Sequence, residues 1–350
     1  MTAAVGINIR RRRAPGEVQG NDLQLPRLQE GARPQHLIMN LFGDYWWGRA
    51  EHLPSAALVA LVGEFDISST SARAALSRLG RRGLLSSSKV GRRTFYGPSP
   101  RTEAAMQEGA DRIFSFAVAD PAPWDGTWLV VTFSVPEEQR DVRHALRMRL
   151  RWLGFAALYD GVWVSPRAGV AATAAAIREC GVRQASLFRA TSLCSAGESG
   201  LGRNPLSAWN LGEVRQAYDD FIARFEPVYE RVVSGEIRAG EALIERTAIT
   251  DTWRLFPALD PDLPAEILPD GWPRQRAYEI FSLLYDSLGP LAEARIRQII
   301  SRYAPDLAGL ARHLTTQARI GPGGGPRSLA AEPQMQPAGG MASWEGLTAG

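Results

Sequence analysis

Cysteine and histidine are scarce in this sequence. Two cysteines, Cys180 and Cys194, and four scattered histidines occur among 350 residues, which is too few for a disulfide framework or for a zinc cluster of familiar spacing. Long apolar runs are missing as well, since no segment approaches the roughly 20 residues that a membrane-spanning helix needs. Residues 10–13 carry the positive charge of a signal peptide, but no apolar segment follows them. We therefore expect a cytoplasmic protein that does not contact a membrane.

Sequence motifs for catalysis are also absent. The chain has no P-loop, no G-x-G-x-x-G phosphate loop and no serine in a G-x-S-x-G turn. Metal-dependent cleavage of a phosphodiester needs carboxylates that hold the metal ions. The strand predicted for residues 127–135 carries none, and Asp125 precedes it. We expect a protein that is not an enzyme and has no cofactor or metal, with a metal-dependent nuclease as the alternative.

Positive charge is concentrated in one segment of the chain. The formal net charge is only +3 and Lys89 is the only lysine, so any nucleic-acid surface has to be local. Between Ser68 and Arg93 the sequence has seven basic residues and no acidic one. A surface that contacts DNA lacks carboxylates because phosphates repel them. The alternative interpretation is an amphipathic helix with a solvated cationic face.

The periodicity of this segment is typical of a helix-turn-helix. One predicted helix begins near Pro54, a second covers residues 70–82, and the tight connection "EFDI" lies between them. In the second helix, apolar residues recur at i, i+3, i+4 and i+7, namely Ala72, Ala75, Leu76 and Leu79. Ser68 or Ser69 can cap its first turn. Small polar side chains and arginines cover the opposite face, and such a face fits the major groove, which is about 12 Å wide.

A basic hairpin follows this helix and completes the pattern of a winged helix. Leu84 and Leu85 begin a strand, "VGRR" at residues 90–93 turns, and "TFYG" returns. We predict base and phosphate contacts from the helix and mainly phosphate contacts from the wing, which can reach the neighbouring minor groove. The predicted DNA-binding residues are Ser69, Thr70, Arg73, Ser77, Arg78, Arg81, Lys89, Arg92, Arg93 and Thr94.

The two ends of the chain differ in composition from the rest. Residues 1–31 mix Gly, Pro, Gln and Arg without periodicity, and residues 321–350 are rich in Gly and Pro. Such segments cannot assemble a core. We therefore predict a disordered arm and a disordered tail.

Three blocks lie between these ends, and together they predict the fold class α+β. Residues 32–116 form the winged-helix block. Residues 120–200 follow the order β-α-β-β-α-β, with a hairpin at Asp160-Gly161, which is the ferredoxin-like arrangement. Residues 205–320 are helical, with a break predicted near Pro227 and a last helix over residues 307–320.

Five stretches of the sequence match the pattern of one family. They are "LFGDY", "SARAALSRLGRRGLL", "GRRTFYGPSPR", "WDGTWLVVTFSVPEEQRDVRHALRMRLRWLGFAALYDGVWVSPR" and "DPDLPAEILPDGWPRQRAYEIFSLLY". From about residue 33 to 300 the chain thereby resembles the PaaX family of repressors of phenylacetate catabolism. The resemblance implies an N-terminal winged helix, a central ferredoxin-like domain similar to small CRISPR-associated nucleases, and a helical C-terminal domain.

The resemblance also implies partners. It predicts a homodimer that binds a palindromic double-stranded DNA operator in the nucleoid and is released by phenylacetyl-CoA or a similar aryl- or acyl-CoA thioester. A transcriptional activator with the same DNA contacts is the alternative. Family members often carry a His-Glu pair where this chain has Asp251 and Thr252, so its ligand can differ from phenylacetyl-CoA.

Aromatic residues of the helical block are candidates for binding this small-molecule effector. The predicted effector-binding residues are Trp253, Arg254, Trp272 and Tyr278. Arg254 suits a phosphate or a thioester carbonyl. The alternative is that these aromatic side chains belong to the core, as they usually do at helical spacing.

A second cationic face is predicted on the helix at residues 137–152. It consists of Arg140, Arg143, Arg147 and Arg151. These arginines could bind phosphates of an effector or of DNA, or they could be structural, either as a solvated face or in ion pairs with Glu137 and Glu138. We favour the second interpretation, in which the face is structural.

Overall fold

The computed structural model describes residues 33–118, 123–191 and 205–320. The predicted arm, the predicted tail and Cys194 lie outside these residues. Two antiparallel sheets are combined with a helical block, which confirms the predicted fold class α+β. None of the described helices is long and apolar enough to cross a membrane.

The N-terminal block has the order of elements of a winged helix. The elements are α1 (Arg33–Tyr45), β1 (Leu53–Pro54), α2 (Ser55–Gly63), α3 (Ser69–Arg81), β2 (Leu85–Val90), β3 (Arg93–Pro98) and α4 (Pro100–Ser115). Its small sheet has the strand order β1-β3-β2. The short strand β1 was not predicted, because two residues are too few to show the alternation of a strand.

Apolar spacing explains how the two helices of the helix-turn-helix pack. The residues that α3 buries are the four predicted from the spacing, and α2 likewise buries Ala57, Leu58, Leu61 and Val62. Asp66, in the connection between the two helices, has a positive φ of 60°. This conformation is uncommon outside glycine, although aspartate tolerates it better than most residues. It allows the chain to turn sharply from α2 into α3.

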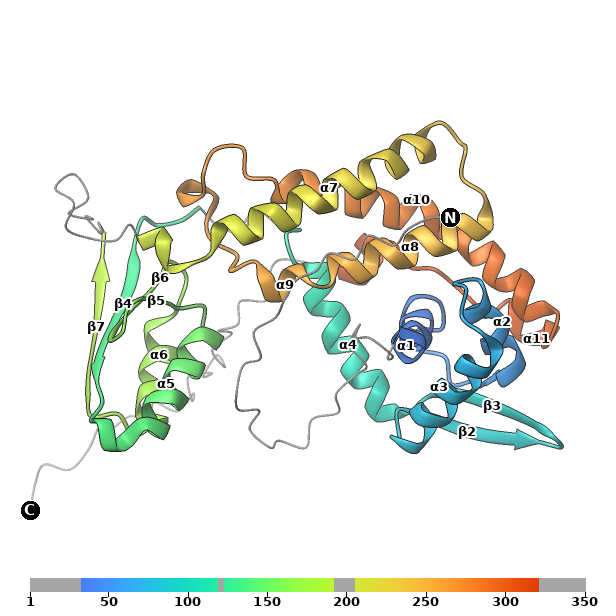
Figure 1. Cartoon of the computed structure of the whole chain (residues 1–350), viewed down its shortest axis with the longest axis horizontal. Helices are drawn as coiled ribbons and strands as arrows, with labels where there is room; N and C mark the ends of the chain where they lie inside the picture. Colours follow the sequence, from blue (N-terminus) through green and yellow to red (C-terminus); the bar gives the residue numbers. More distant parts are fainter. Residues whose placement is uncertain (1–32, 119–122, 192–204, 321–350) are drawn as a thin grey trace, which may run out of the picture.

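The central block is a four-stranded sheet with two helices on one face. Its elements are β4 (Trp128–Ser134), α5 (Arg140–Trp152), β5 (Ala156–Tyr159), β6 (Val162–Ser165), α6 (Val170–Glu179) and β7 (Gln184–Ala190), with a 3-10 turn over Glu137–Gln139. The strand order β5-β6-β4-β7 with antiparallel pairing is that of a ferredoxin-like fold. Figure 1 shows α5 and α6 side by side along this sheet, and their core includes Leu146, Leu150 and Trp163.

The C-terminal block, residues 205–320, consists of three long helices and three short ones. The elements are α7 (Leu211–Val233), α8 (Ala239–Trp253), α9 (Phe256–Leu259), α10 (Arg274–Ser301), α11 (Pro305–Ala308) and α12 (Thr316–Ile320), with 3-10 turns over Pro205–Ala208 and Ala265–Ile267. In Figure 1, α7, α8 and α10 run along one side of the molecule, and α10 extends to the winged helix.

Two predictions about this block are wrong. Pro227 does not break the chain into two helices, since α7 continues through it. Phe221 and Phe225 before the proline are buried, and Val228 and Tyr229 after it also pack against the core. This packing on both sides offsets the backbone hydrogen bond that proline removes. The last predicted helix, over residues 307–320, is instead two short helices, α11 and α12.

The winged-helix and helical blocks share one hydrophobic core. A single cluster of buried residues runs from Leu37 in α1 to Ala311, after α11. Phe114, in the last turn of α4, packs against the rings of Tyr285 and Phe281 at 5.0 and 5.9 Å between centroids. The boundary predicted near residue 116 therefore does not separate two cores. The central sheet, by contrast, has one core of its own, and a second, small cluster joins it to the helical block.

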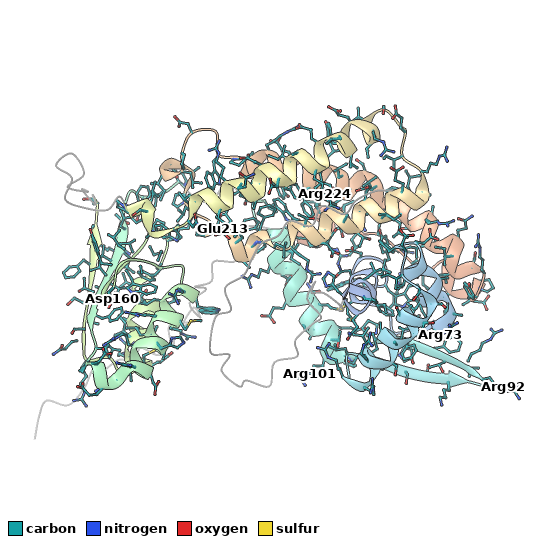
Figure 2. The ribbon with its side chains drawn as sticks, viewed as in Figure 1. Arg73, Arg92, Arg101, Asp160, Glu213 and Arg224 are labelled. Carbon is teal, nitrogen blue, oxygen red and sulfur yellow. The ribbon has the colours of Figure 1, made fainter. Side chains whose placement is uncertain are left out.

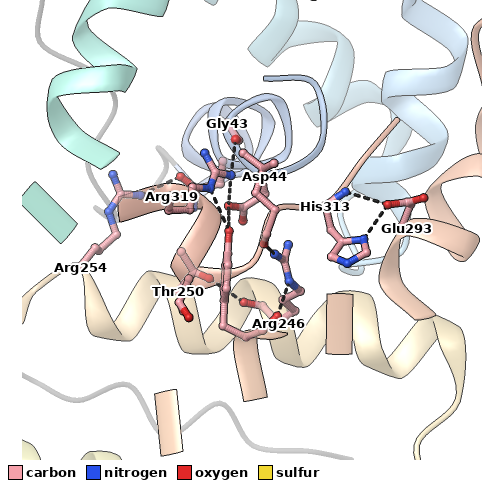
Figure 3. A network of polar contacts seen from close by, with 12 residues as sticks. Gly43, Asp44, Arg246, Thr250, Arg254, Glu293, His313 and Arg319 are labelled. Carbon is pink, nitrogen blue, oxygen red and sulfur yellow. Dashed lines mark hydrogen bonds and ion pairs between the residues drawn. The ribbon is translucent and has the colours of Figure 1, made fainter. Parts of the chain in front are cut away.

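A buried arginine lies in the middle of this shared core. The guanidinium of Arg246 stacks on the ring of Tyr285 at 3.8 Å and faces Tyr45 at 5.0 Å. It donates hydrogen bonds to the carbonyl oxygens of Tyr285 (2.8 Å) and Leu314 (2.9 Å). Arg319 donates to the carbonyl of Gly43 at 2.7 Å. These contacts hold α1 against α8, α10 and α12, and Figure 3 shows Arg246 and Arg319 in this network.

Candidate nucleic-acid interface

Helix α3 presents one polar face outside the molecule. The side chain of Ser68 accepts a hydrogen bond from the Ser71 backbone N–H at 3.2 Å and so caps the first turn. Ser69, Thr70, Arg73, Ser77 and Arg81 are exposed, and Arg78 is half-buried. All six residues predicted on this helix thus lie on its solvent side or at the flank of it.

Two contacts organise the arginines of this helix. Arg73 donates from Nη1 to Oγ of Ser69 at 3.3 Å, so the two side chains lie together near the start of α3. Arg82 donates to Oε1 of Gln35 on α1 at 3.3 Å. Arg82 therefore ties α3 to α1, and we do not add it to the predicted interface.

The wing is a hairpin with a two-residue turn at Gly91 and Arg92. Val90 pairs with Arg93 and Lys89 with Thr94, as the sequence predicted. Gly91 has a φ of 59°, which suits such a turn. Lys89, Arg92 and Arg93 are exposed, whereas Thr94 is half-buried. Figure 2 shows Arg73 on α3 and Arg92 at the wing tip, both at the end of the molecule away from the central sheet.

His52 positions the wing, a role that the sequence did not reveal. Its two ring nitrogens lie 3.0 Å from Oγ of Ser86 and 2.9 Å from Oγ of Ser88, both on β2. The ring also lies close to Gly97, where a Cβ atom would come within 2.5 Å of His52 Cδ2. A glycine is needed there because any side chain would displace the imidazole. His52 lies 45 residues before Gly97, and no local sequence pattern connects the two, so the contact could not be predicted.

The cations of α3 and the wing have no carboxylate partner among the described residues. None of Arg73, Arg78, Arg81, Lys89, Arg92 and Arg93 forms an ion pair there. Together with the exposure of this surface, the absence of carboxylates leaves a local positive field. Such a field is what a polyanion requires.

The second cationic face, on α5, differs in this respect. Arg140 and Arg143 both pair with Glu137, at 2.5 and 2.9 Å, and Arg147 pairs with Asp160 at 2.5 Å. Arg151 lies over the ring of Trp163 at 5.4 Å. These contacts support the structural interpretation of this face, although the acidic partners are Glu137 and Asp160 rather than Glu137 and Glu138.

The four predicted effector-binding residues are not equivalent in the structure. Trp253 is fully buried, its ring stacks on Phe281 at 4.7 Å, and its Nε1 donates to the carbonyl of Ile113 at 3.3 Å. This placement makes Trp253 a core residue rather than the lining of a pocket. Trp272 and Tyr278 are half-buried at the edge of the same aromatic cluster. Arg254, which follows α8, does line a pocket.

Asp125, the carboxylate before β4, stabilises a turn. Its Oδ1 accepts hydrogen bonds from the backbone N–H and the hydroxyl of Thr127, at 2.8 and 2.5 Å. These hydrogen bonds lower the pKa of Asp125. Within residues 33–118, 123–191 and 205–320, no group of three or more His, Cys, Asp or Glu side chains is placed to hold a metal ion.

Comparison with known proteins gives consistent matches along the chain. Three family models match: a PaaX-like protein over residues 33–101, the PaaX protein central Cas2-like domain over residues 121–201, and the PaaX-like protein C-terminal domain over residues 209–298. The transcriptional repressor PaaX of Escherichia coli K12 is 26% identical over 265 residues, which span 75% of this chain and 82% of that protein. A solved structure, the uncharacterized protein Rv0674 from Mycobacterium tuberculosis, matches with a TM-score of 0.47 and 19% identity over 80% of this chain and 100% of the other.

Proposed function

Because this chain belongs to the PaaX family of transcriptional regulators, we propose that it is a repressor that binds double-stranded DNA through α3 and the wing. The observation that carries the proposal is the set of six cations on α3 and β2–β3 that have no carboxylate partner among the described residues. The paired arginines of α5 supply the contrast within the same chain. If the cations of α3 and the wing served only to be solvated, nothing would prevent nearby carboxylates from pairing with them, as carboxylates do on α5.

The two elements have different tasks in the proposed complex. Helix α3 enters the major groove, where Arg73, Ser77 and Arg81 reach base edges and phosphates. The wing lies beside it, and Lys89, Arg92 and Arg93 contact phosphates or the neighbouring minor groove. The four arginines at residues 10–13 lie outside the described residues, and we propose that they add non-specific affinity.

We also propose that the repressor is a homodimer on a palindromic operator. Two recognition helices related by a two-fold axis read two half-sites, so their separation sets the half-site spacing. The family supports this arrangement, with the central sheet and the helical block as the parts that bring two copies together. Sedimentation of the purified protein with and without an operator duplex tests it, and a single copy on a palindrome would contradict it.

Release by an aryl- or acyl-CoA-type ligand is the third part of the proposal. A ligand that favours a dimer whose recognition helices miss the half-site spacing lowers operator affinity. Isothermal titration with phenylacetyl-CoA and with free CoA tests this step. If neither titration shows binding, release by this ligand class is contradicted. The proposal that the protein binds DNA would still stand.

Immunoprecipitation of the protein with its bound genomic DNA is the decisive experiment. We expect promoter fragments, and the genes beside them identify the regulated pathway. Expression of these genes in a deletion strain separates repressor from activator, because loss of a repressor raises transcription. Incubation of the protein with duplex DNA and Mg²⁺ or Mn²⁺ tests the nuclease alternative, for which cleavage is the required result. Recovery of no promoter DNA would contradict the proposed function.

A further inference from the structure

An open groove lies between α1 and α4 of the winged helix. It consists of two adjoining hollows, of about 330 and about 80 Å³. The apolar residues that line the larger hollow include Phe42, Trp46 and Ala104. Trp47 and Met106 line both hollows and thus lie where they meet. The groove therefore offers a continuous surface of indole, phenyl and thioether groups.

The smaller hollow ends at polar side chains from the helical block. Arg254 and Arg319 line it together with Asn40, Asp44 and Thr250. Arg319 is already bound, because it donates to the Gly43 carbonyl and pairs with Asp44 at 3.4 Å. Arg254, by contrast, has guanidinium nitrogens that bind none of the described residues. In Figure 3 the two arginines approach the end of α1 from the same side.

Arg254 uses one of its three nitrogens. Its Nη1 donates to Oδ1 of Asn40 at 2.7 Å and lies 3.0 Å from Nε2 of His36. The same Nη1 lies 3.6 Å from the carboxylate of Asp251, which also binds His36 and Asn40. No hydrogen bond from Nε or Nη2 reaches a described residue, and the side chain is 25% exposed. A planar guanidinium with two unused nitrogens suits a carboxylate or carbonyl oxygen.

We propose that this groove binds a small ligand made of one flat apolar ring and a carboxylate or carbonyl oxygen. The ring lies against Trp47 and Met106, because aromatic and thioether groups pack well on a flat apolar surface. The oxygen accepts hydrogen bonds from Arg254. The inference rests on the proposed function, since it gives the ligand of that regulator its site.

The size of the groove limits what enters. Ligand pockets span about 300–1,000 Å³, and the larger hollow is at the lower end of this range. A single ring with a short acyl chain fits there. A bulky leaving group on the acyl carbon, such as a nucleotide-bearing thiol, stays in solvent at the mouth.

The location couples the groove to the DNA-binding surface. Helix α1 packs on α3 through the shared core, and α4 begins directly after β3 of the wing. Arg254 holds α1 against α8 through Asn40. A ligand that binds Nε and Nη2 of Arg254 and separates α1 from α4 favours a second position of α3 relative to the helical block, and it thereby changes operator affinity.

One substitution can fill the groove without disturbing the core. Gly109 lies in the middle of α4 and lines the smaller hollow, and a Cβ atom there would have no neighbour within 4 Å. Leucine at this position occupies the hollow and also raises the helix propensity by roughly 1 kcal/mol. Loss of folding is therefore not an explanation for lost binding in Gly109→Leu. Glu108→Leu is the matched control, because Glu108 is exposed and lines neither hollow.

Binding is measured on the full chain by tryptophan fluorescence with phenylacetate and phenylacetyl-CoA as probes, and with acetate as the head group without a ring. We expect both aromatic probes to quench Trp46 and Trp47, and acetate to have no effect. Gly109→Leu should weaken the aromatic probes by about tenfold or more, whereas Glu108→Leu should leave them unchanged. Equal affinity in wild type and Gly109→Leu, or no quenching by either aromatic probe, overturns the site.

Arg254 is tested by substitutions that separate its charge from its shape. Arg254→Gln should weaken the aromatic probes, and Arg254→Lys should restore part of the affinity because it keeps one charged donor. Fluorescence anisotropy with promoter DNA is measured on the same samples. If the probes bind Gly109→Leu and wild type equally while both still bind the promoter, only the proposed ligand site is overturned. If the wild-type protein binds no promoter, the proposed function is overturned.

Discussion

Glu64, which follows the last turn of α2, and Arg295, on α10, form a bidentate ion pair. The distances from Arg295 Nε and Nη2 to the two carboxylate oxygens of Glu64 are 2.8 and 2.9 Å. Both side chains are about one quarter exposed. The pair fastens the helix-turn-helix directly to the helical block, at the edge of their shared core.

We expect this pair to stabilise the fold measurably. Glu64→Gln and Arg295→Met should each lower the free energy of unfolding by about 1–2 kcal/mol, since partly buried bidentate pairs are stronger than surface pairs. A double-mutant cycle followed by chemical unfolding measures the coupling. The exposed pair of Arg276 and Glu226 is the control, and Glu226→Gln should cost much less. If the losses of the two single variants add up to the loss of the double variant, the contact contributes nothing to the free energy of unfolding.

The wing should contribute electrostatic affinity that does not depend on sequence. Arg92→Ala combined with Arg93→Ala should weaken binding to all duplexes alike and reduce the slope of log K against log salt by about one unit per lost phosphate contact. The measurement is anisotropy over a salt series. Arg178→Ala with Arg183→Ala removes the same charge from exposed sites on the central block. If the two double variants behave identically, the wing does not touch DNA.

Helix α3 should determine sequence preference. Arg73→Ala or Arg81→Ala should cost about 1–3 kcal/mol on the preferred operator and relax the preference at one or two base positions. Selection from a random duplex pool measures this change. Uniform weakening without a change in the selected sequence would assign these arginines to phosphates.

Buried tyrosines should make the fold sensitive to alkali. Burial raises the pKa of Tyr45, Tyr218 and Tyr285 above the ordinary value near 10. Because the unfolded chain ionises first, the stability that these groups contribute is complete below about pH 10 and is lost as the pH rises further, by about 1.4 kcal/mol for each unit of pKa difference.

Phenolate absorbance checks this prediction. These three of the eight tyrosines should ionise at a higher pH than the exposed ones, together with the loss of circular dichroism. In denaturant all eight should titrate near pH 10. Tyr218→Phe should reduce the protected fraction. Titration of every tyrosine near pH 10 in a chain that is still folded would contradict the burial.

Local sequence patterns predict the helices and turns of this protein well, because the conformation of each depends on residues that are close in sequence. The spacing of Ala72, Leu76 and Leu79 predicts the buried face of α3, and this face is observed. The turns at Gly91 and Asp160-Gly161 also lie where predicted. Side-chain direction in a helix, or pairing across a two-residue turn, depends on neighbours only a few residues away.

Contacts between distant parts of the chain could not be predicted in this way. The ring of Trp253 looks the same in sequence whether it lines a pocket or stacks on Phe281. His36 lies 215 residues before its partner Asp251, and no periodicity connects them. The uninterrupted helix through Pro227 has the same cause, since packing against residues far along the chain outweighs the local cost of the proline.

The continuous core determines where this protein can be cut and recombined with its relatives. A chimera that exchanges residues 33–116 alone would set Phe114 against an unfamiliar Tyr285 and Phe281, and it would leave both halves with mismatched apolar surfaces. The central sheet meets the helical block through a much smaller apolar cluster, which includes Trp209 and Ile267. A graft of new DNA specificity therefore has to carry the helical block with it, whereas the central sheet is the module that can be exchanged alone.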